Sequence, residues 1–217
     1  MKIALAIVVT VLVALSGRAQ THAAAVDSAG NTAGIFIVRP DPRECPSPLC
    51  GGYWVSLANH ARTRCSDGLL RPRCYVADVV QTDAREPSAL ASGALAKGVL
   101  GMKDSDEFGQ LGVLNFSASW APVARNPATG DFFRLRDTGV RCVRAPCFSI
   151  RARVVNASTR STLVSSLDLG PARSGTVRHR AEAALSSPDG LLLAGAIVRA
   201  ADGGRVCRAS QVYLKSS

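Results

Sequence analysis

Histidine and aromatic residues are scarce in this chain of 217 residues, which has three histidines and 5% Phe, Trp and Tyr. The sequence contains no G-x-S-x-G, H-E-x-x-H or S-x-x-K motif, and so none of these nucleophile or zinc-hydrolase signatures. His60 follows Asn59 at an expected strand end and has no catalytic partner nearby in sequence, and the other histidine of the mature chain is His179. The sequence therefore predicts no catalytic residue, no cofactor and no metal, and it favours a protein that is not an enzyme.

The chain also lacks a hydrophobic run long enough to cross a bilayer, which takes about 20 residues. Its apolar run at residues 3–15 follows Met1-Lys2 and precedes an A-x-A site at residues 23–25. These are the three parts of a secretory signal peptide. We expect a signal peptide over residues 1–25, cleaved near Ala25, a short linker over 26–32, and a secreted or periplasmic mature chain. An uncleaved membrane anchor is the alternative.

Cysteine, in contrast, is abundant, with seven residues in the chain. Outside the cytoplasm cysteines pair by default. Two C-x4-C motifs each enclose a proline and predict a stapled turn, and a third pair brackets a plausible hairpin end. A zinc site on the first four cysteines is the alternative. The predicted bridges are Cys45–Cys50, Cys65–Cys74 and Cys142–Cys147, and Cys207 is left as a buried thiol.

The two C-x4-C motifs belong to an internal repeat with an offset of 97 residues. The same offset carries Asn59 onto Asn156. Each copy is expected to run strand, stapled turn, strand, strand, helix, strand, although the second copy has no counterpart of the third cysteine pair. The predicted units are residues 33–129 and 130–217, either as two domains or as one combined domain.

Hydrophobic periodicity supports these elements. Over residues 114–120 the even positions are apolar and the odd positions polar, the period of a strand with one buried face. Alanine-rich segments at 88–100 and 174–185 are predicted to be helices, the second with Ser174 as its N-cap. Strands outnumber helices. We therefore predict an α+β fold in which antiparallel sheets are covered on one face by helices.

Positive charge is concentrated in the second repeat. Residues 33–129 include ten basic and nine acidic residues, whereas residues 130–217 include fourteen and six. Several of these arginines alternate with apolar residues and are expected on the solvent face of one sheet or on the following helix. The predicted anion-binding residues are Arg134, Arg136, Arg151, Arg153, Arg178 and Arg180.

The expected partner of this basic surface is an anionic envelope polymer, with a secreted protein as another option. A solvated surface without a ligand is the alternative. No aromatic residues are interleaved with the arginines. Because stacking on aromatic rings is a main source of single-strand binding, we expect no specific nucleic acid partner.

The sequences R-P-D-P-R-E-C at 39–45 and C-G-G-Y-W-V at 50–55, with G-V-R-C at 139–142 and A-P-C at 145–147, resemble an uncharacterised domain family. That family occurs in secreted proteins of bacteria, myxobacteria among them. The resemblance covers most of the mature chain. It implies export and a bacterial source, and it implies no reaction, cofactor or catalytic residue.

Three functions fit these observations. The first is a non-enzymatic secreted or envelope module, stabilised by disulfides, that binds a partner or serves a structural role. A loop fixed by a disulfide loses little entropy on binding. The second is a protease inhibitor that presents Arg144-Ala145 in the loop between Cys142 and Cys147. The third is an extracellular hydrolase, which needs His60 or His179 beside a carboxylate and a nucleophile.

Overall fold

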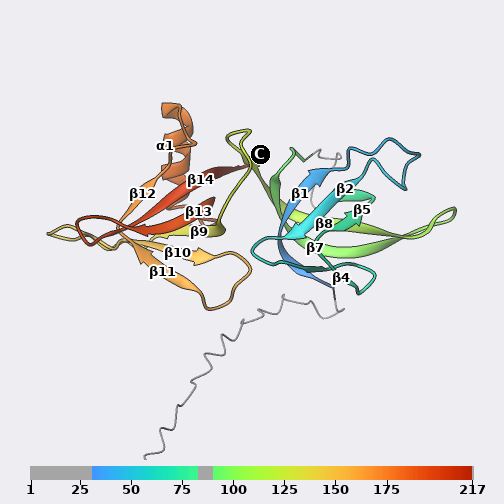
Figure 1. Ribbon diagram of the computed structural model, residues 1–217, viewed down its shortest axis with the longest axis horizontal. Coiled ribbons are helices and arrows are strands. Elements are labelled where there is room, and N and C mark those ends of the chain that lie inside the picture. Colours follow the sequence, from blue (N-terminus) through green and yellow to red (C-terminus); the bar gives the residue numbers. More distant parts are fainter. Residues whose placement is uncertain (1–30, 83–89, 217) are drawn as a thin grey trace, which may run out of the picture.

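The computed structural model describes residues 31–82 and 90–216 of the chain, and strands account for most of its regular structure (Figure 1). The strands before residue 130 are β1 (Ala33–Pro40), β2 (Tyr53–Leu57), β3 (Thr63–Arg64), β4 (Leu70–Arg71), β5 (Cys74–Val76), β6 (Asp78–Gln81), β7 (Ala94–Ser105) and β8 (Gly109–Pro122). The elements after residue 130 are β9 (Asp131–Asp137), β10 (Ile150–Val154), β11 (Ser161–Val164), β12 (Ser166–Asp168), α1 (Gly175–Ala184), β13 (Leu191–Arg199) and β14 (Arg205–Lys215). We call residues 33–129 the first half and residues 130–216 the second half.

The predicted α+β class is wrong, because the protein is essentially all-β. Strands make up 50% of the chain and helix 6%, and α1 is the one α-helix in the described part. The error lies mainly in the alanine-rich segment at 88–100, whose first two residues fall outside the described residues. From Ala94 onward this segment is strand β7, which pairs with β1 on one side and β8 on the other.

Strand pairing on both sides explains why β7 is not a helix. Ala94, Leu95 and Ala96 are all buried, so both faces of the strand are covered. A side chain at Gly98 would collide with the backbone of β8 at Asn115. Burial and close pairing of this kind outweigh the helical preference of alanine, because tertiary context overrides local propensity.

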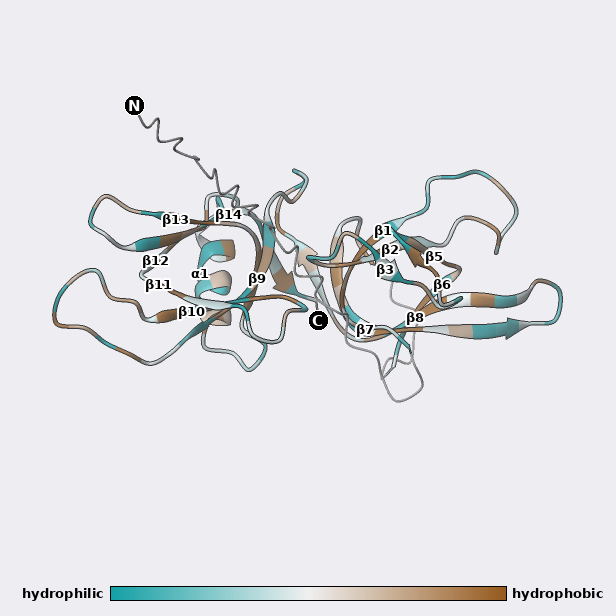
Figure 2. Cartoon of the chain, turned by 60° about the horizontal axis from the view of Figure 1, so that its bottom comes forward, coloured by the Kyte–Doolittle hydropathy of each residue, from teal (hydrophilic) through white to brown (hydrophobic). Residues whose placement is uncertain are grey.

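The predicted helix of the second half is present as α1. The side chain of Ser174 accepts a hydrogen bond from the backbone N–H of Val177 at 3.2 Å, which makes Ser174 the N-cap as predicted. The helix lies across the strands of the second half and carries both hydrophilic and hydrophobic residues (Figure 2). Its buried residue is Ala181, which packs into the core of that half.

The two halves have the same strand order. It runs β5-β2-β1-β7-β8 in the first half and β11-β10-β9-β13-β14 in the second. In each half one further strand is parallel to the last, β6 to β8 and β12 to β14. Antiparallel pairing of β14 with β8, as at Lys215 and Trp120, joins the halves into one sheet of twelve strands within the described residues.

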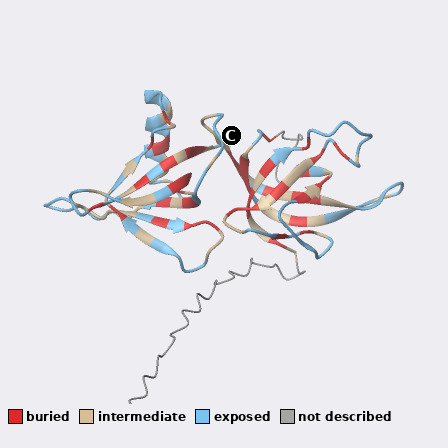
Figure 3. Cartoon of the chain, viewed as in Figure 1, coloured by how far each residue is buried: buried red, intermediate tan, exposed pale blue. Residues whose placement is uncertain are grey.

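Buried residues lie along the strands of both halves (Figure 3), and they form three hydrophobic cores. One lies within the first half around Phe36 and Leu57, and one lies within the second half around Leu135 and Leu193. The third joins the halves and uses side chains from the opposite face of the strands. Its buried members are Ile35, Ala58, Leu95, Trp120, Phe132, Val155, Leu192, Ala194 and Tyr213.

The expected signal peptide at 1–25 lies outside the described residues, as does most of the linker at 26–32. Across the residues that the structure does describe, none of the helical structure is long and apolar enough to cross a membrane.

Candidate anion-binding site

Four of the predicted arginines lie side by side on strands β9 and β10. Phe133 and Leu135 point into the core of the second half, so Arg134 and Arg136 emerge on the opposite face of the sheet. The antiparallel register places Arg151 directly opposite Arg136 and Arg153 directly opposite Arg134. We call these four residues the arginine array: Arg134, Arg136, Arg151 and Arg153.

The arginine array lines a cavity of about 570 Å³ at the junction of the two halves. The first half contributes Ala33 and Ile35 to its wall, and the second half contributes all the other lining residues. These are the array itself with Val154, Val155, Asn156, Ala157 and Ser158. The site therefore combines four guanidinium groups with an apolar wall, and it depends on how the halves pack together.

The positive charge of the arginine array is not neutralised by an ion pair with the residues that the structure describes. None of the four side chains forms a hydrogen bond or salt bridge with another described residue. The pKa of Arg134 is lowered, first by burial and then by the charge of Arg136, and the charge of Arg153 lowers it further. Asp189 opposes this shift, but its carboxylate is already 2.6 Å from the Lys215 ammonium.

Like charges directly opposite each other in a sheet are destabilising. Two such arginine pairs in adjacent register therefore carry an electrostatic cost, which the charge of Asp189 opposes only at Arg134. A bound anion removes this repulsion and supplies charge-assisted hydrogen bonds, for which the planar guanidinium group is well suited.

The remaining two predicted arginines lie elsewhere. Arg178 and Arg180 are exposed on helix α1. Buried Ala181 of that helix belongs to the same core as Leu135, so α1 lies on the core side of β9, away from the arginine array. Neither Arg178 nor Arg180 lines the cavity. The structure thus brings the four strand arginines together and places Arg178 and Arg180 apart from them, and the anion-binding role of all six stays a prediction.

Two asparagines fix the junction beside the cavity, and the first comes from the first half. The Asn59 side-chain oxygen accepts a hydrogen bond from the Phe132 N–H at 2.8 Å. Its NH₂ group donates to the carbonyl oxygens of Phe132 at 2.8 Å and Val155 at 3.0 Å. Its backbone φ is 63°, a left-handed conformation that asparagine tolerates better than most residues.

Asn156 makes the reciprocal contacts from the second half. Its side-chain oxygen accepts from the Ile35 N–H at 2.9 Å, and its NH₂ group donates to the carbonyl oxygens of Ile35 at 2.8 Å and Ala58 at 2.9 Å. Its φ is 58°. Each of these residues lies 97 positions from its counterpart in the Asn59 contacts. We call these six hydrogen bonds the asparagine bridge. The sequence pointed to the two asparagines only through their shared offset of 97 residues, and it predicted no role for them.

The three predicted disulfides are present, and Cys207 is a buried free thiol. The zinc alternative does not fit, because all four of its cysteines are in disulfides. Burial raises the pKa of Cys207 to about 12, which keeps this thiol protonated and unreactive.

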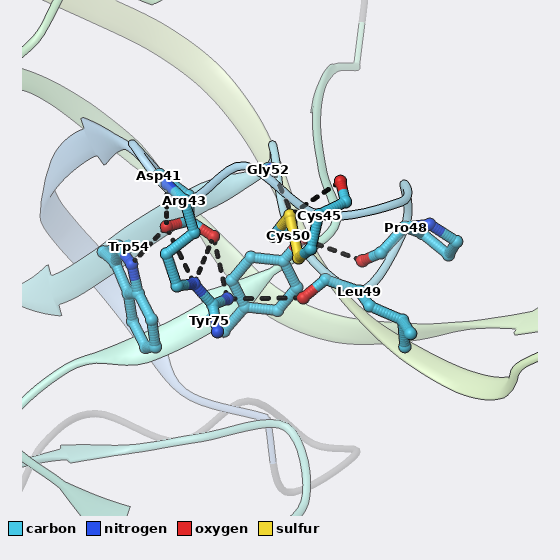
Figure 4. A network of polar contacts seen from close by, with 9 residues as sticks. All are labelled: Asp41, Arg43, Cys45, Pro48, Leu49, Cys50, Gly52, Trp54 and Tyr75. Carbon is cyan, nitrogen blue, oxygen red and sulfur yellow. Dashed lines mark hydrogen bonds and ion pairs between the residues drawn. A yellow bond between two sulfur atoms is a disulfide. The ribbon is translucent and has the colours of Figure 1, made fainter.

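The first stapled turn, Cys45 to Cys50, is attached to the sheet by a polar network (Figure 4). The buried carboxylate of Asp41 lies 2.8 Å from the Arg43 guanidinium and accepts a hydrogen bond from the Trp54 indole N–H at 3.1 Å. The hydrogen bond from Arg43 is the main reason that the pKa of Asp41 is lowered from 3.8 to about 2.

The same network reaches the ring of the turn itself. Arg43 lies 5.1 Å from the ring centre of Trp54 and 5.2 Å from that of Tyr75, and it donates to the carbonyl oxygen of Leu49. The Tyr75 hydroxyl donates to the carbonyl oxygen of Pro48 at 2.8 Å. The cationic side chain of Arg43, next to this turn, is therefore occupied by contacts within the protein.

The second stapled turn, Cys142 to Cys147, is open to solvent. Its neighbour Arg141 pairs with Asp137 at 2.9 Å. Val143 is fully exposed, at 101%. Arg144 is also exposed, and it forms no hydrogen bond or ion pair with another described residue.

The histidines do not assemble a hydrolytic site within the described residues. The Nε2 atom of His60 lies 3.3 Å from the carbonyl oxygen of Asn156 at the junction. His179 is exposed on α1, and its side chain forms no hydrogen bond or ion pair with another described residue. Neither ring contacts a carboxylate in that part of the chain, so the geometry gives the hydrolase hypothesis no support.

The chain matches the family model described as Domain of unknown function (DUF6748) over residues 34–217, and it belongs to that family. This confirms the predicted membership of an uncharacterised domain family. The bacterial distribution of the family and the stapled turns as its signature stay predictions. No curated protein and no solved structure matches the chain.

Proposed function

From its place in a domain family of unknown function, we propose that the protein is a non-enzymatic, disulfide-stabilised binding module that engages an anionic partner through the arginine array. One observation carries the proposal: four arginines without an internal partner stand in cross-strand register around a cavity at the junction of the halves. Arginine recognises phosphate, sulfate and carboxylate groups through paired N–H donors.

We also propose that the module is secreted or periplasmic, with its signal peptide removed near Ala25. Three disulfides fit an oxidising compartment. In that setting the partner is an anionic component of the envelope or of the surroundings.

The first half supports this assignment as an internal reference. We propose that the halves are two copies of one structural unit, because strand order and the asparagine bridge correspond at a constant offset. The positions that match the arginine array in the first half pair as Arg39 with Trp54 and Ile37 with Ser56. One arginine stands there in place of four, so the fold itself does not require the array.

Retention on a heparin column, with elution by salt, tests the proposed function. We expect the double variant Arg151→Glu/Arg153→Glu to elute at clearly lower salt than the unaltered protein. The matched control is Arg178→Glu/Arg180→Glu, which changes the net charge equally on helix α1. We expect the control to shift elution little, because charges outside the cavity contribute only general attraction.

Equal shifts for the two double variants, or retention that survives the change at Arg151 and Arg153, would refute the placement of the site. Thermal unfolding of each variant shows whether the fold is intact. Relief of the repulsion within the arginine array is expected to leave the strand variant at least as stable as the control.

A protease inhibitor is the second candidate, favoured by the exposure of Val143 and Arg144 on a disulfide-closed turn. Titration of trypsin with the purified protein tests it. Stoichiometric loss of trypsin activity supports inhibition, whereas undiminished activity at molar excess removes this candidate.

A further inference from the structure

The arginine array is elongated along the strands. Directly opposite side chains in an antiparallel pair lie about 5 Å apart, and residues two positions along a strand lie about 7 Å apart. A single phosphate or sulfate is held well by one or two arginines. Four guanidinium groups in two successive pairs therefore match a ligand with at least two anionic groups in a row.

The basic surface continues beyond the array. Strand β9 ends at Asp137 and β10 begins at Ile150, so the second stapled turn lies at the Arg136 and Arg151 end of the array. This turn is at the end of the second half that is farthest from the first half (Figure 1). It carries Arg144, which is exposed and has no described partner. Free positive charge thus follows the β9–β10 hairpin from the junction to its outer end.

The wall of the cavity narrows the class of ligand. Among its lining residues there is no aromatic ring for a base to stack on. Arg134 is partly buried in the hollow, where a flat lipid surface does not reach it. The apolar side chains of Ala33, Ile35 and Ala157 face the same space. They offer contact to the C–H faces of sugar rings, while the arginines take the acidic groups.

On the basis of the proposed function, we infer that the ligand is a linear acidic polysaccharide. It lies along the β9–β10 hairpin, with successive sulfate or carboxylate groups on the two arginine pairs and a further one at Arg144. The apolar wall from the first half packs against its sugar rings. The second stapled turn fixes the outer contact of the chain.

Equilibrium binding by fluorescence anisotropy tests this inference with labelled long heparin chains, a heparin disaccharide and polygalacturonate, which carries carboxylates in place of sulfates. We expect both polymers to bind and the disaccharide to bind at least about tenfold more weakly, because it engages fewer arginines. We expect Arg144→Glu to weaken binding of long heparin about threefold, the scale of an exposed charge contact, and to leave the disaccharide unchanged. Arg178→Glu is the matched control and is expected to change neither.

The outcomes distinguish failure of the anion site from failure of the linear ligand. If Arg151→Glu/Arg153→Glu binds long heparin as tightly as the unaltered protein, the proposed function itself is overturned. A disaccharide that binds as tightly as the polymer, or an Arg144→Glu variant identical to the control, overturns the linear ligand and leaves the anion site standing. Equal or tighter binding of single-stranded DNA, or of vesicles rich in anionic lipid, overturns the assignment to a polysaccharide.

Discussion

The two halves build the same strand order around different charge arrangements. In the first half, Asp41 neutralises Arg43, and the aromatic rings of Trp54 and Tyr75 enclose it. In the second half, the corresponding hairpin leaves the arginine array without a partner and places Arg144 in solvent. The cores and the asparagine bridge maintain the fold in both halves, so the outer face of this hairpin is free to carry a binding surface.

The halves also differ by one insertion. The sequence offset is 97 residues at Asn59 and 88 residues at Tyr75, whose counterpart by strand register is Leu163. Nine additional residues therefore lie between these points in the first half, the same as the separation of Cys65 and Cys74. The longer connection of the first half forms the β3–β4 hairpin, and its Cys65–Cys74 bridge places a buried disulfide in the core of that half. The second half has a helix, α1, against its core.

Removal of single disulfides is expected to have the largest effect and to separate the buried bridge from the exposed one. Cys65→Ala/Cys74→Ala loses a loop constraint and leaves a cavity in the first core, so we expect a loss of about 4 kcal/mol in unfolding free energy. Cys142→Ala/Cys147→Ala loses only the constraint, for a loss of about 2 kcal/mol. Denaturant unfolding measures both.

Limited proteolysis with trypsin sharpens the comparison between the stapled turns. Without its disulfide the second turn is expected to be cut at Arg144. The segment that leads into the first turn is expected to resist cleavage after Arg43 in Cys45→Ala/Cys50→Ala, because the contacts of Arg43 with Asp41 and Tyr75 still hold it. Equal cleavage of the two turns would show that this network adds nothing to the bridge.

Variants of the asparagine bridge test whether the halves are equivalent at their junction. Asn59→Ala and Asn156→Ala each remove three hydrogen bonds and force alanine into a left-handed conformation. We expect each to lower the unfolding free energy by about 3 kcal/mol. The glycine variants keep the backbone freedom and isolate the hydrogen-bond contribution. Unequal losses at the two positions, beyond about 1 kcal/mol, would contradict the internal symmetry.

Sequence patterns specified the β9 and β10 faces and the N-cap at Ser174 because these depend on local alternation and on one short-range hydrogen bond. They failed at β7, since the partners that make Ala94 to Ala96 a central strand come from β1 and β8. They assigned Arg178 to the helix and could not show that it lies apart from the strand arginines, because sequence gives no information on which side of the sheet α1 packs. The first-half wall at Ile35 depends on contacts across more than a hundred residues, and no local signal marks it.

Acid unfolding distinguishes the buried ion pair of the first half from the exposed one of the second. The folded pKa of Asp41 is lowered from 3.8 to about 2, so its contribution to stability is present above the ordinary pKa and is lost as the pH falls toward 2. We expect Asp41→Asn to reduce the dependence of the thermal midpoint on pH in this range. Asp137, whose pKa is lowered mainly by a hydrogen bond from Arg141, is the matched position.

We expect Asp137→Asn to change the acid profile less than Asp41→Asn does. The Asp137 pair is more exposed and anchors no aromatic network, and exposed ion pairs contribute little. A profile that Asp41→Asn leaves unaltered would show that Arg43 does not hold this carboxylate ionised in the folded protein.

The smallest expected effect is at Cys207. This residue occupies the position in the second half that Leu114 holds in the first half. Strand register pairs Leu114 with Val79 and Cys207 with Leu167, and both residues are fully buried. The thiol therefore serves as a small core side chain, and we expect Cys207→Ala to cost about 1 kcal/mol, against about 3 kcal/mol for Leu114→Ala. Burial raises the pKa of the thiol to about 12, so we expect no reaction with an aromatic disulfide reagent until the protein is unfolded. Rapid modification of the folded protein would show instead that the core of the second half opens to solvent without global unfolding.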